Sequence, residues 1–419
     1  MPICGHMKVV EERGLADMKI VIAIDSFKGS MSSADAGNAA KTGILRACGA
    51  DIIVKPLADG GEGTTEALVE GLGGEYISLE VSGPLGAKTD VRYGILGDGR
   101  TAVLEMAEAA GITLVKPEEL DPSRATTYGV GEMILDAVNR GCREFIIGIG
   151  GSATSEGGAG MLQALGYEII DEEGKNIGPG IRDLDRIASI SQKNVPDALK
   201  ECHFNIACDV ENPLCGENGA VYVYGPQKGV KEEEKQSFDE KLRHFADKTR
   251  EYLQRASCGA CIAGADGAHR IGDAADYRWA KGAGAAGGLG FAFLSYLPNA
   301  ELKSGIDIVL DAVGLEQEVK DADIVVTGEG RLDSQTAMGK VPVGVARLAK
   351  KYGARVLAFA GGIAEDAGIC NEAGIDAFFP IVRGVTTMEE AMLPENAKKN
   401  MELSVEQVFR AIITQNRNG

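Results

Sequence analysis

The chain has 419 residues, of which 44% are hydrophobic and 25% are charged. At about 150 residues per domain, this length predicts two or three domains. Its 43 Lys and Arg against 62 Asp and Glu give a formal net charge of −19. Because a surface this acidic repels phosphate backbones and anionic membrane faces, we expect neither nucleic acid nor a membrane as a partner.

The cysteines and the N-terminal segment indicate a cellular compartment. Nine cysteines are an odd number and lack the dense spacing of a secreted disulfide scaffold. Residues 1–17 carry scattered charges and no apolar core of an export signal, and no uninterrupted apolar run is long enough to span a membrane. We therefore expect a cytoplasmic protein in which residues 1–17 are a disordered extension.

Strands and helices alternate at the start of the chain. Apolar, β-branched runs predict strands over residues 19–24 and 51–55, and helical patterns follow them over 33–48 and 64–72. This alternation is typical of a parallel βαβ sheet.

The middle of the chain has a different pattern. Strand candidates over residues 75–81, 88–96 and 101–106 are separated by Gly and Pro turns, which favours an antiparallel or mixed sheet. We then expect helices over 128–139 and 231–255, and a strand over 144–149.

Clean alternation returns in the final third. Strands are predicted over residues 323–327, 355–360 and 377–381, with helices over 342–352 and up to about residue 414. We therefore predict an α/β fold in which a discontinuous doubly wound domain, residues 18–75 and 295–419, carries an inserted second α/β domain of mixed sheet, residues 76–294. The ligand cleft is expected between them.

Polar loops follow the predicted strands, and ligands of open parallel sheets collect at the carboxyl ends of the strands. The first loop contains Asp25, Ser26 and Lys28, and the second contains Asp59 and Glu62 among glycines. Each of the two segments is equally well explained as a plain polar turn.

The third loop, residues 148–161, is the longest glycine-rich segment. Its bare N–H groups favour binding of a polyphosphate at a positive helix end. It contains no G-x-x-x-x-G-K-[ST] string, so the protein is no P-loop kinase. The candidate residues in this loop are Gly150, Gly151, Ser152, Thr154 and Gly158.

The fourth loop, residues 327–333, brings Glu329, Arg331 and Asp333 to a strand end, with Lys340 just beyond. A surface ion pair would also explain an arginine beside acids. The location favours a functional site.

Two further segments carry candidates. Asp209 and Asn212 follow a short predicted strand. They could serve as a base and as a ligand for substrate or metal, and an Asx turn before proline explains them as well. Gly284, Gly287 and Gly288 lie in a G-x-G-x-x-G run, but the residues before it do not resemble a strand, so close helix packing explains these glycines as well.

Zinc and triad chemistry are disfavoured. Cys258 and Cys261 form a lone C-x-x-C, and the four histidines, His6, His203, His244 and His269, stand in no metal or triad motif. Glycine loops, hydroxyls, carboxylates and a few cations without a nucleophile and base pair are what phosphoryl transfer from Mg-ATP needs. The cations that would offset the acidic surface are Lys28, Lys281, Arg331 and Lys340.

Two alternatives remain open. A dehydrogenase of a small hydroxy acid would bind NAD(P) at residues 282–290 and read the ribose with an acid such as Glu301, but it lacks the preceding strand. A non-catalytic organic-acid-binding module would not need the carboxylates on the candidate loops.

A series of motifs in order resembles the bacterial glycerate kinase family of glucarate and glyoxylate breakdown. The strings are DSFKGSMSS (25–33), PLADGGEGT (56–64), IGGSATSEGGAGM (149–161), ACDVENPLCGENGA (207–220), GPQKG (225–229), GAGAAGGLG (282–290) and VTGEGRLDSQTAMGKVPVGVA (326–346). The resemblance implies transfer of phosphate from ATP to D-glycerate, with 2-phosphoglycerate favoured over the 3-phospho isomer. It also implies that the doubly wound domain is flavodoxin-like.

With this resemblance, each candidate residue receives a hypothetical role. Asp209 would orient or deprotonate the attacking hydroxyl, and Lys28 and Arg331 would bind the glycerate carboxylate or the transferred phosphoryl group. Asp25, Ser26, Asn212 and Lys340 would contact substrate, and the two glycine segments would hold ATP. The expected Mg²⁺ ligands are Asp59, Glu62, Glu329 and Asp333. Whether the protein forms a homo-oligomer is left open.

Overall fold

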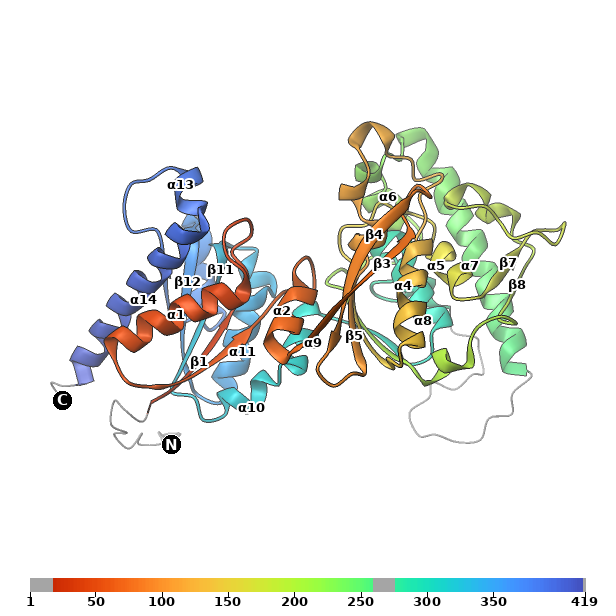
Figure 1. Ribbon diagram of the computed structural model, residues 1–419. Helices are drawn as coiled ribbons and strands as arrows, with labels where there is room; N and C mark the ends of the chain where they lie inside the picture. The colour runs from red at the N-terminus through yellow and green to blue at the C-terminus, as the bar shows by residue number, and fades with distance from the viewer. Residues whose placement is uncertain (1–17, 259–275, 417–419) are drawn as a thin grey trace, which may run out of the picture. The chain divides into compact units, whose positions relative to one another are not determined.

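The computed structural model describes residues 18–258 and 276–416 (Figure 1). These residues form two compact units: the first contains the described residues up to Asp59 and from Val309 onward, and the second runs from Gly60 to Ile308. Residues 60–75 and 295–308, which the sequence assigned to the first domain, therefore group with the second unit. The reason is packing. Helix α2 (Thr64–Leu72) packs on β4 (Lys88–Leu96) and β5 (Thr101–Glu105), and β10 (Ala300–Lys303) pairs with β9 (His203–Ala207).

The first unit contains a five-stranded parallel sheet in the order β13-β12-β11-β1-β2. Numbered within this unit, the order is the 2-1-3-4-5 of flavodoxin-like folds, so the predicted fold class is confirmed. The strands are β1 (Lys19–Ile24), β2 (Asp51–Pro56), β11 (Ile324–Leu332), β12 (Arg355–Ile363) and β13 (Ala377–Pro380).

Helices cover both faces of this sheet (Figure 1). On one face α1 (Ser33–Ala47) and α14 (Pro394–Asn416) pack on the isoleucines of β1, for example Ile22 against a core that includes Phe409. On the other face α11 (Val341–Lys351) packs on β11, β12 and β1. Shorter helices complete the unit: α10 (Leu315–Val319), α12 (Ile369–Glu372) and α13 (Met388–Met392), with α9 (Gly305–Ala312) spanning the boundary.

The second unit contains a six-stranded sheet in the order β10-β9-β6-β5-β4-β3. The sheet is mixed, as the sequence predicted. The pairs β3–β4 and β4–β5 are antiparallel, and the other pairs are parallel. Its remaining strands are β3 (Gly74–Ser82), β4 (Lys88–Leu96), β5 (Thr101–Glu105), β6 (Glu144–Gly148) and β9 (His203–Ala207). A separate two-stranded antiparallel sheet pairs β7 (Glu168–Ile170) with β8 (Ser189–Ser191).

The helices of the second unit include one whose start differs from the prediction. The helix expected from residue 231 begins at Lys235, because residues 232–234 form a 3₁₀ turn in which the Lys231 amide donates to Glu234. The helices are α2, α3 (Ala107–Ala110), α4 (Tyr128–Asn139), α5 (Ala159–Ala164), α6 (Ala220–Tyr224), α7 (Lys235–Cys258) and α8 (Ala285–Tyr296). In the described part of the chain, no helix is long and apolar enough to cross a membrane.

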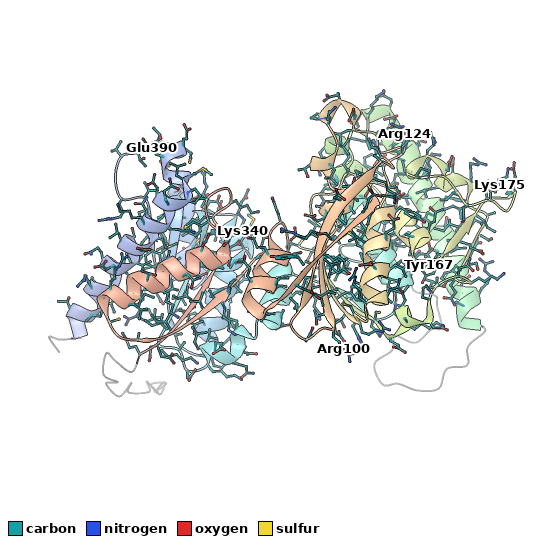
Figure 2. All side chains as sticks on the ribbon, in the orientation of Figure 1. Arg100, Arg124, Tyr167, Lys175, Lys340 and Glu390 are labelled. Carbon is teal, nitrogen blue, oxygen red and sulfur yellow. The ribbon has the colours of Figure 1, made fainter. Side chains whose placement is uncertain are left out.

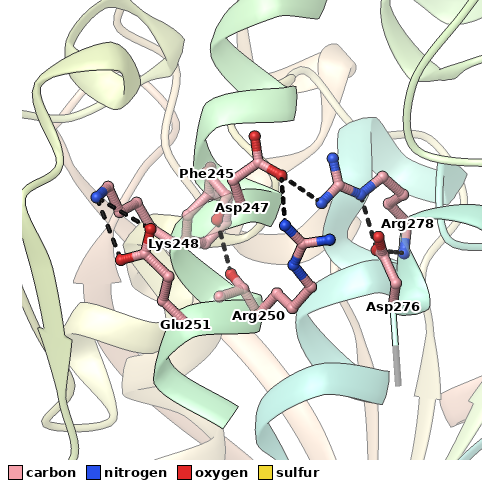
Figure 3. Close-up of polar contacts among 8 residues, drawn as sticks. Phe245, Asp247, Lys248, Arg250, Glu251, Asp276 and Arg278 are labelled. Atoms are coloured by element: carbon pink, nitrogen blue, oxygen red, sulfur yellow. Dashed lines mark hydrogen bonds and ion pairs between the residues drawn. The ribbon is translucent and has the colours of Figure 1, made fainter. Parts of the chain in front are cut away.

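An ion-pair chain on α7 anchors the segment that precedes residues 282–290 (Figure 3). Arg278, which is buried, donates from Nη2 to Asp247 Oδ1 at 2.6 Å and from Nε to Asp276 Oδ1 at 2.7 Å. Arg250 lies 3.9 Å from the same Asp247 oxygen. These contacts fix the entry to α8.

Candidate active site

In the first unit, the ends of three parallel strands are tied together. The hydroxyl of Ser33 donates to the Ile24 carbonyl at 2.6 Å and accepts from the Leu57 amide at 2.7 Å, which joins the ends of β1 and β2. The Asp25 amide donates to the Gly328 carbonyl of β11 at 3.0 Å. Because β1 lies between β2 and β11, this edge contains the point where the strand order reverses, the usual ligand site of this fold.

Three acidic side chains, which we call the carboxylate cluster, interact electrostatically at this edge: Asp25, Asp59 and Glu329. Asp25 is only 6% exposed. Burial and the negative charges of Asp59 and Glu329 raise the pKa of Asp25 to about 7, against the opposing effects of the Ser26 amide and Lys28. A bound cation would relieve this mutual repulsion.

Glu329 shows the same electrostatic pattern. Burial raises its pKa, and so do the charges of Asp333 and Asp59, while a hydrogen bond from the Thr336 hydroxyl and the charge of Lys340 oppose the shift. Lys340 immediately precedes α11 (Figure 2). The cluster therefore combines buried negative charge with a nearby lysine.

Two exposed cations belong to the same edge. A Cβ on Gly330 would lie 3.8 Å from the Lys28 amide nitrogen, so the loop after β1 runs close to β11. The side chain of Arg331 is 72% exposed, with its Nε 3.8 Å from Asp333 Oδ2. Lys28 and Arg331 thus lie at the same end of this sheet as Asp25 and Glu329.

The prediction of a loop over residues 327–333 is wrong. These residues continue β11 as far as Leu332, which pairs with Ile363 of β12. Gly328 allows the two strands to approach, since a Cβ there would stand 2.1 Å from the Phe359 carbonyl oxygen. The glycine therefore serves strand pairing.

The four expected Mg²⁺ ligands are not gathered as one group. Asp333 Oδ1 accepts the amides of Gln335 and Thr336 at 3.0 and 3.2 Å and so caps a turn. Glu62 is exposed and belongs to the second unit. Among the described residues, no three acid, histidine or cysteine side chains form a ready-made metal site.

In the second unit, the strand ends present mostly backbone. Glu105, at the end of β5, accepts the Thr65 amide at 2.9 Å and holds the start of α2. A Cβ on Gly60 would lie 2.5 Å from Gly305 Cα and 2.8 Å from Ala207 Cβ, so the loop before α2 packs on the ends of β9 and β10. Asp209 is exposed at this edge, and its Oδ1 accepts the Gly305 amide at 3.1 Å.

The glycine-rich loop, residues 148–161, is open at only two positions. Gly150 and Gly151 are exposed, whereas residues 152–161 are buried. A Cβ on Gly150 would meet nothing within 4 Å, and one on Gly151 only the Ala107 methyl group at 3.7 Å. Among the described residues, no acceptor engages the amide of either glycine.

The anion site expected at the start of α5, the helix that follows this loop, is not formed either. Helix α5 has six residues, and the protein itself occupies its first amides: Gly160 donates to Glu156 Oε1 and Met161 to Thr127 Oγ1, both at 2.9 Å. Glu156 is completely enclosed, and burial raises its pKa. These amides are therefore not available to a polyphosphate.

The second glycine run packs against the glycine-rich loop. A Cβ on Gly287 would lie 2.0 Å from the Thr154 carbonyl oxygen, one on Gly288 2.7 Å from Gly157 Cα, and one on Gly158 2.5 Å from Ala292 Cβ. Gly284 donates its amide to the Asn212 carbonyl at 2.9 Å. These glycines are buried, so close backbone packing accounts for them.

The other candidates of this unit have structural partners. Asn212 accepts from the Tyr224 hydroxyl and donates to the Asn218 carbonyl, so its amide fixes a loop. Lys281 pairs with Glu211 on the surface. A 3₁₀ turn, Tyr277–Trp279, precedes the glycine run in place of a strand, which removes the basis for a dinucleotide site. Four predictions concern positions outside the described residues: the extension over residues 1–17, His6 within it, Cys261 and His269.

Lys228 is a buried residue of the second unit whose place no sequence pattern indicated. This side chain is 1% exposed, and its Nζ donates to Ser152 Oγ and to the Thr154 carbonyl, both at 2.6 Å. Burial lowers the pKa of Lys228 to about 7. The motif GPQKG contains Lys228, but periodicity and spacing do not indicate that this lysine lies under the glycine-rich loop. The two segments are distant in the chain and meet only in the folded unit.

The protein has an α/β fold in which carboxylates, lysines and open glycine backbone lie at the strand ends of two sheets. It has no P-loop sequence. These groups are the ones that a small-molecule kinase uses. Residues 20–413 match the family model described as the glycerate kinase family. The chain therefore belongs to the glycerate kinase family, and it is a kinase.

Its relatives agree along nearly the whole chain. The chain is 45% identical to a glycerate kinase of Bacillus subtilis, covering 94% of this chain and 98% of that protein. It is 44% identical to a glycerate 2-kinase of Escherichia coli, with 89% and 93% covered. A crystal structure assigned as glycerate kinase 2 from Salmonella typhimurium LT2 superposes with a TM-score of 0.84 at 40% identity, covering 96% of this chain and 100% of that one.

Proposed function

We propose that the protein transfers the γ-phosphoryl group of ATP to the 2-hydroxyl of D-glycerate by in-line displacement, giving 2-phosphoglycerate. The carboxylate cluster is the observation that carries this proposal. Burial and neighbouring negative charges raise the pKa of Asp25 and the pKa of Glu329 in the vicinity of Lys28 and Lys340, which suits a bound cation and phosphate. The Escherichia coli relative named glycerate 2-kinase supports the choice of hydroxyl.

The first unit would hold Mg²⁺ and the small substrate. Asp59 and Glu329 supply the hard oxygen donors that Mg²⁺ prefers, and one or two carboxylates suffice when phosphates complete the shell. Mg²⁺ bound there would neutralise negative charge on the transferred phosphoryl group. Lys28 and Arg331, both exposed, would bind the glycerate carboxylate or the phosphoryl group, and Asp25, Ser26 and Lys340 would line the site.

The second unit would supply the nucleotide contacts and the base. The open amides of Gly150 and Gly151 would donate to phosphate oxygens of ATP. Asp209 would accept the proton of the attacking hydroxyl: its Oδ1 is held by the Gly305 amide, which fixes the carboxylate at the end of β9. This assignment narrows the backbone contacts with the nucleotide to Gly150 and Gly151, the exposed part of the glycine-rich loop.

The test is a coupled ADP-release assay with Mg-ATP and D-glycerate, followed by phosphorus NMR of the product. We expect ADP release that requires both substrates, and a single phosphomonoester signal of 2-phosphoglycerate. L-glycerate and tartronate serve as comparison substrates. A 3-phosphoglycerate signal would overturn the regiochemistry, and no ADP release from folded protein would overturn the reaction.

The free thiols of the described residues support a proposal about the compartment. We propose that the protein acts in the reducing cytoplasm, because Cys48, Cys142, Cys202, Cys208, Cys215 and Cys370 are free thiols in the described structure. Alkylation of denatured protein taken directly from cells, read by mass spectrometry, should label these cysteines without prior reduction. Labelling only after reduction would contradict this location.

A further inference from the structure

Lys228 is a buried cation without a buried anion. Its Nζ hydrogen-bonds to Ser152 Oγ and the Thr154 carbonyl, and within the described ranges no ion pair joins it to a carboxylate. Burying an ammonium group without a counter-charge is costly, and carbonyl and hydroxyl dipoles compensate it only in part. The site is therefore electrostatically incomplete in the protein alone.

The hydrogen bonds of Lys228 leave the proton of Ser152 free to point elsewhere. An ammonium group has three donors and no acceptor, so Ser152 Oγ accepts from Nζ. The proton of the Ser152 hydroxyl is then available to another acceptor, and no hydrogen bond found in the described part of the chain uses it. Ser152 is 5% exposed and directly follows the two open glycines.

Three donors therefore stand on three consecutive residues: the amides of Gly150 and Gly151 and the hydroxyl of Ser152. The positive charge of Lys228 lies directly behind the hydroxyl. Neutral donors backed by a buried cation are a setting suited to a phosphate oxygen, because the charge strengthens the donor it polarises.

We propose that Lys228 and Ser152 form an anion-recognition pair, in which Lys228 holds and polarises the Ser152 hydroxyl so that it donates to a phosphate oxygen of the bound nucleotide. Lys228 is thus a positioning residue and Ser152 the contact. This proposal rests on the proposed use of ATP. It assigns to the glycine-rich loop a positive charge that is absent from its own sequence.

The lowered pKa of Lys228 agrees with this role. Burial alone brings it to about 7 in the protein without ligand. A phosphate bound at Ser152 would favour the charged form and raise the pKa again. Lys228 would therefore carry its full charge when the nucleotide is present.

The test compares three single variants. Lys228→Met keeps the volume but removes the charge and both hydrogen bonds, and Ser152→Ala removes only the contact. Lys231→Met is the matched control, because it removes an exposed lysine from the same segment. We expect Lys228→Met to raise the KM for Mg-ATP at least about tenfold and Ser152→Ala about fivefold, as for loss of a charge-assisted hydrogen bond.

A selective effect distinguishes recognition from loop support. The KM for D-glycerate should stay within about twofold, and the rise in Tm that Mg-ATP induces in the wild type should shrink in both variants but not in Lys231→Met. The double variant should be little worse than Lys228→Met alone. If the Lys228 variant does not fold, Ser152→Ala alone decides.

Two results would overturn the inference: an unchanged KM for Mg-ATP in Ser152→Ala, or a parallel loss of kcat and of affinity for both substrates, which marks a collapsed loop. Failure of the proposed function looks different. The wild type itself would then release no ADP and show no thermal shift with Mg-ATP, whatever the variants do.

Discussion

The two units of this protein use the same part of a sheet in opposite ways. In the first unit the strand ends carry charged side chains, namely the carboxylate cluster and the lysines and arginine around it. In the second unit the strand ends carry backbone, and the buried charges of Glu156 and Lys228 are turned toward the protein. The difference teaches that one architecture can supply both ionic and dipolar binding sites.

Each arrangement follows from how charge is compensated. The negative charges of three neighbouring acids repel one another, and a bound cation would offset this repulsion. Glu156 accepts hydrogen bonds from the amides of Thr127, Gly160 and Gly180, and these bonds hold the loops in place. Asp209 is the exception in the second unit, because it is exposed and has one oxygen held by an amide.

The largest expected effect tests that exception. Asp209→Asn should lower kcat by about 10²- to 10⁴-fold without lowering Tm, because an amide cannot accept the hydroxyl proton. Steady-state kinetics with both substrates measure this. Glu211→Gln, two residues away and paired on the surface, should keep wild-type kcat. Wild-type turnover in Asp209→Asn would remove it as the base and leave the second unit without a catalytic charge.

The packing of the two glycine segments gives the next effect. Gly287→Ala should lower the free energy of unfolding by about 3–5 kcal/mol, because it adds a clash with the Thr154 carbonyl to an unfavourable positive φ of 69°. Gly314→Ala is the control: its φ is 64°, but nothing lies within 4 Å, so only about 1 kcal/mol should be lost. Equal losses in urea unfolding would show that backbone strain alone explains both.

Asp25 should link the first unit to pH. Its pKa rises from 3.8 to about 7 on folding, so the native state binds the proton more tightly and the free energy of unfolding falls as pH rises from about 4 to 7. Asp25→Asn should therefore be more stable than wild type at pH 8, by at most about 4 kcal/mol, and nearly equal to it near pH 4.

Urea unfolding in metal-free buffer at both pH values measures this difference. Asp311→Asn, at an exposed position of the same unit, should show no pH-dependent gain. A constant difference between Asp25→Asn and wild type would mean that Asp25 does not carry the mutual repulsion of the cluster.

The smallest effect concerns an exposed cation. Lys28→Ala should raise the KM for D-glycerate about tenfold and change kcat less, because an ammonium–carboxylate contact contributes to binding about as much as a partly screened ion pair. Lys320→Ala, an exposed lysine of the same unit, should leave KM unchanged. An unchanged KM in Lys28→Ala would assign the carboxylate to Arg331 instead.

Local patterns were sufficient for most elements. The helices over 64–72 and 128–139 and the strand over 19–24 have the bounds that the sequence predicts, because each is delimited by its own periodicity and by neighbouring turn residues. The sequence also placed Asp25 and Glu329 at the same edge, since chain order and sheet polarity bring the residue after β1 beside β11.

The sequence by itself thus determined the alternation of strands and helices, the class of fold and the family. Tertiary structure alone decided that residues 327–332 pair as a strand, that Gly287 and Gly288 face backbone, and that Lys228 lies buried under Ser152. The physical reason is range. Periodicity and turn chemistry act over a few residues, whereas close packing, burial and the resulting pKa shifts depend on segments that are distant in the chain and meet only in the folded unit.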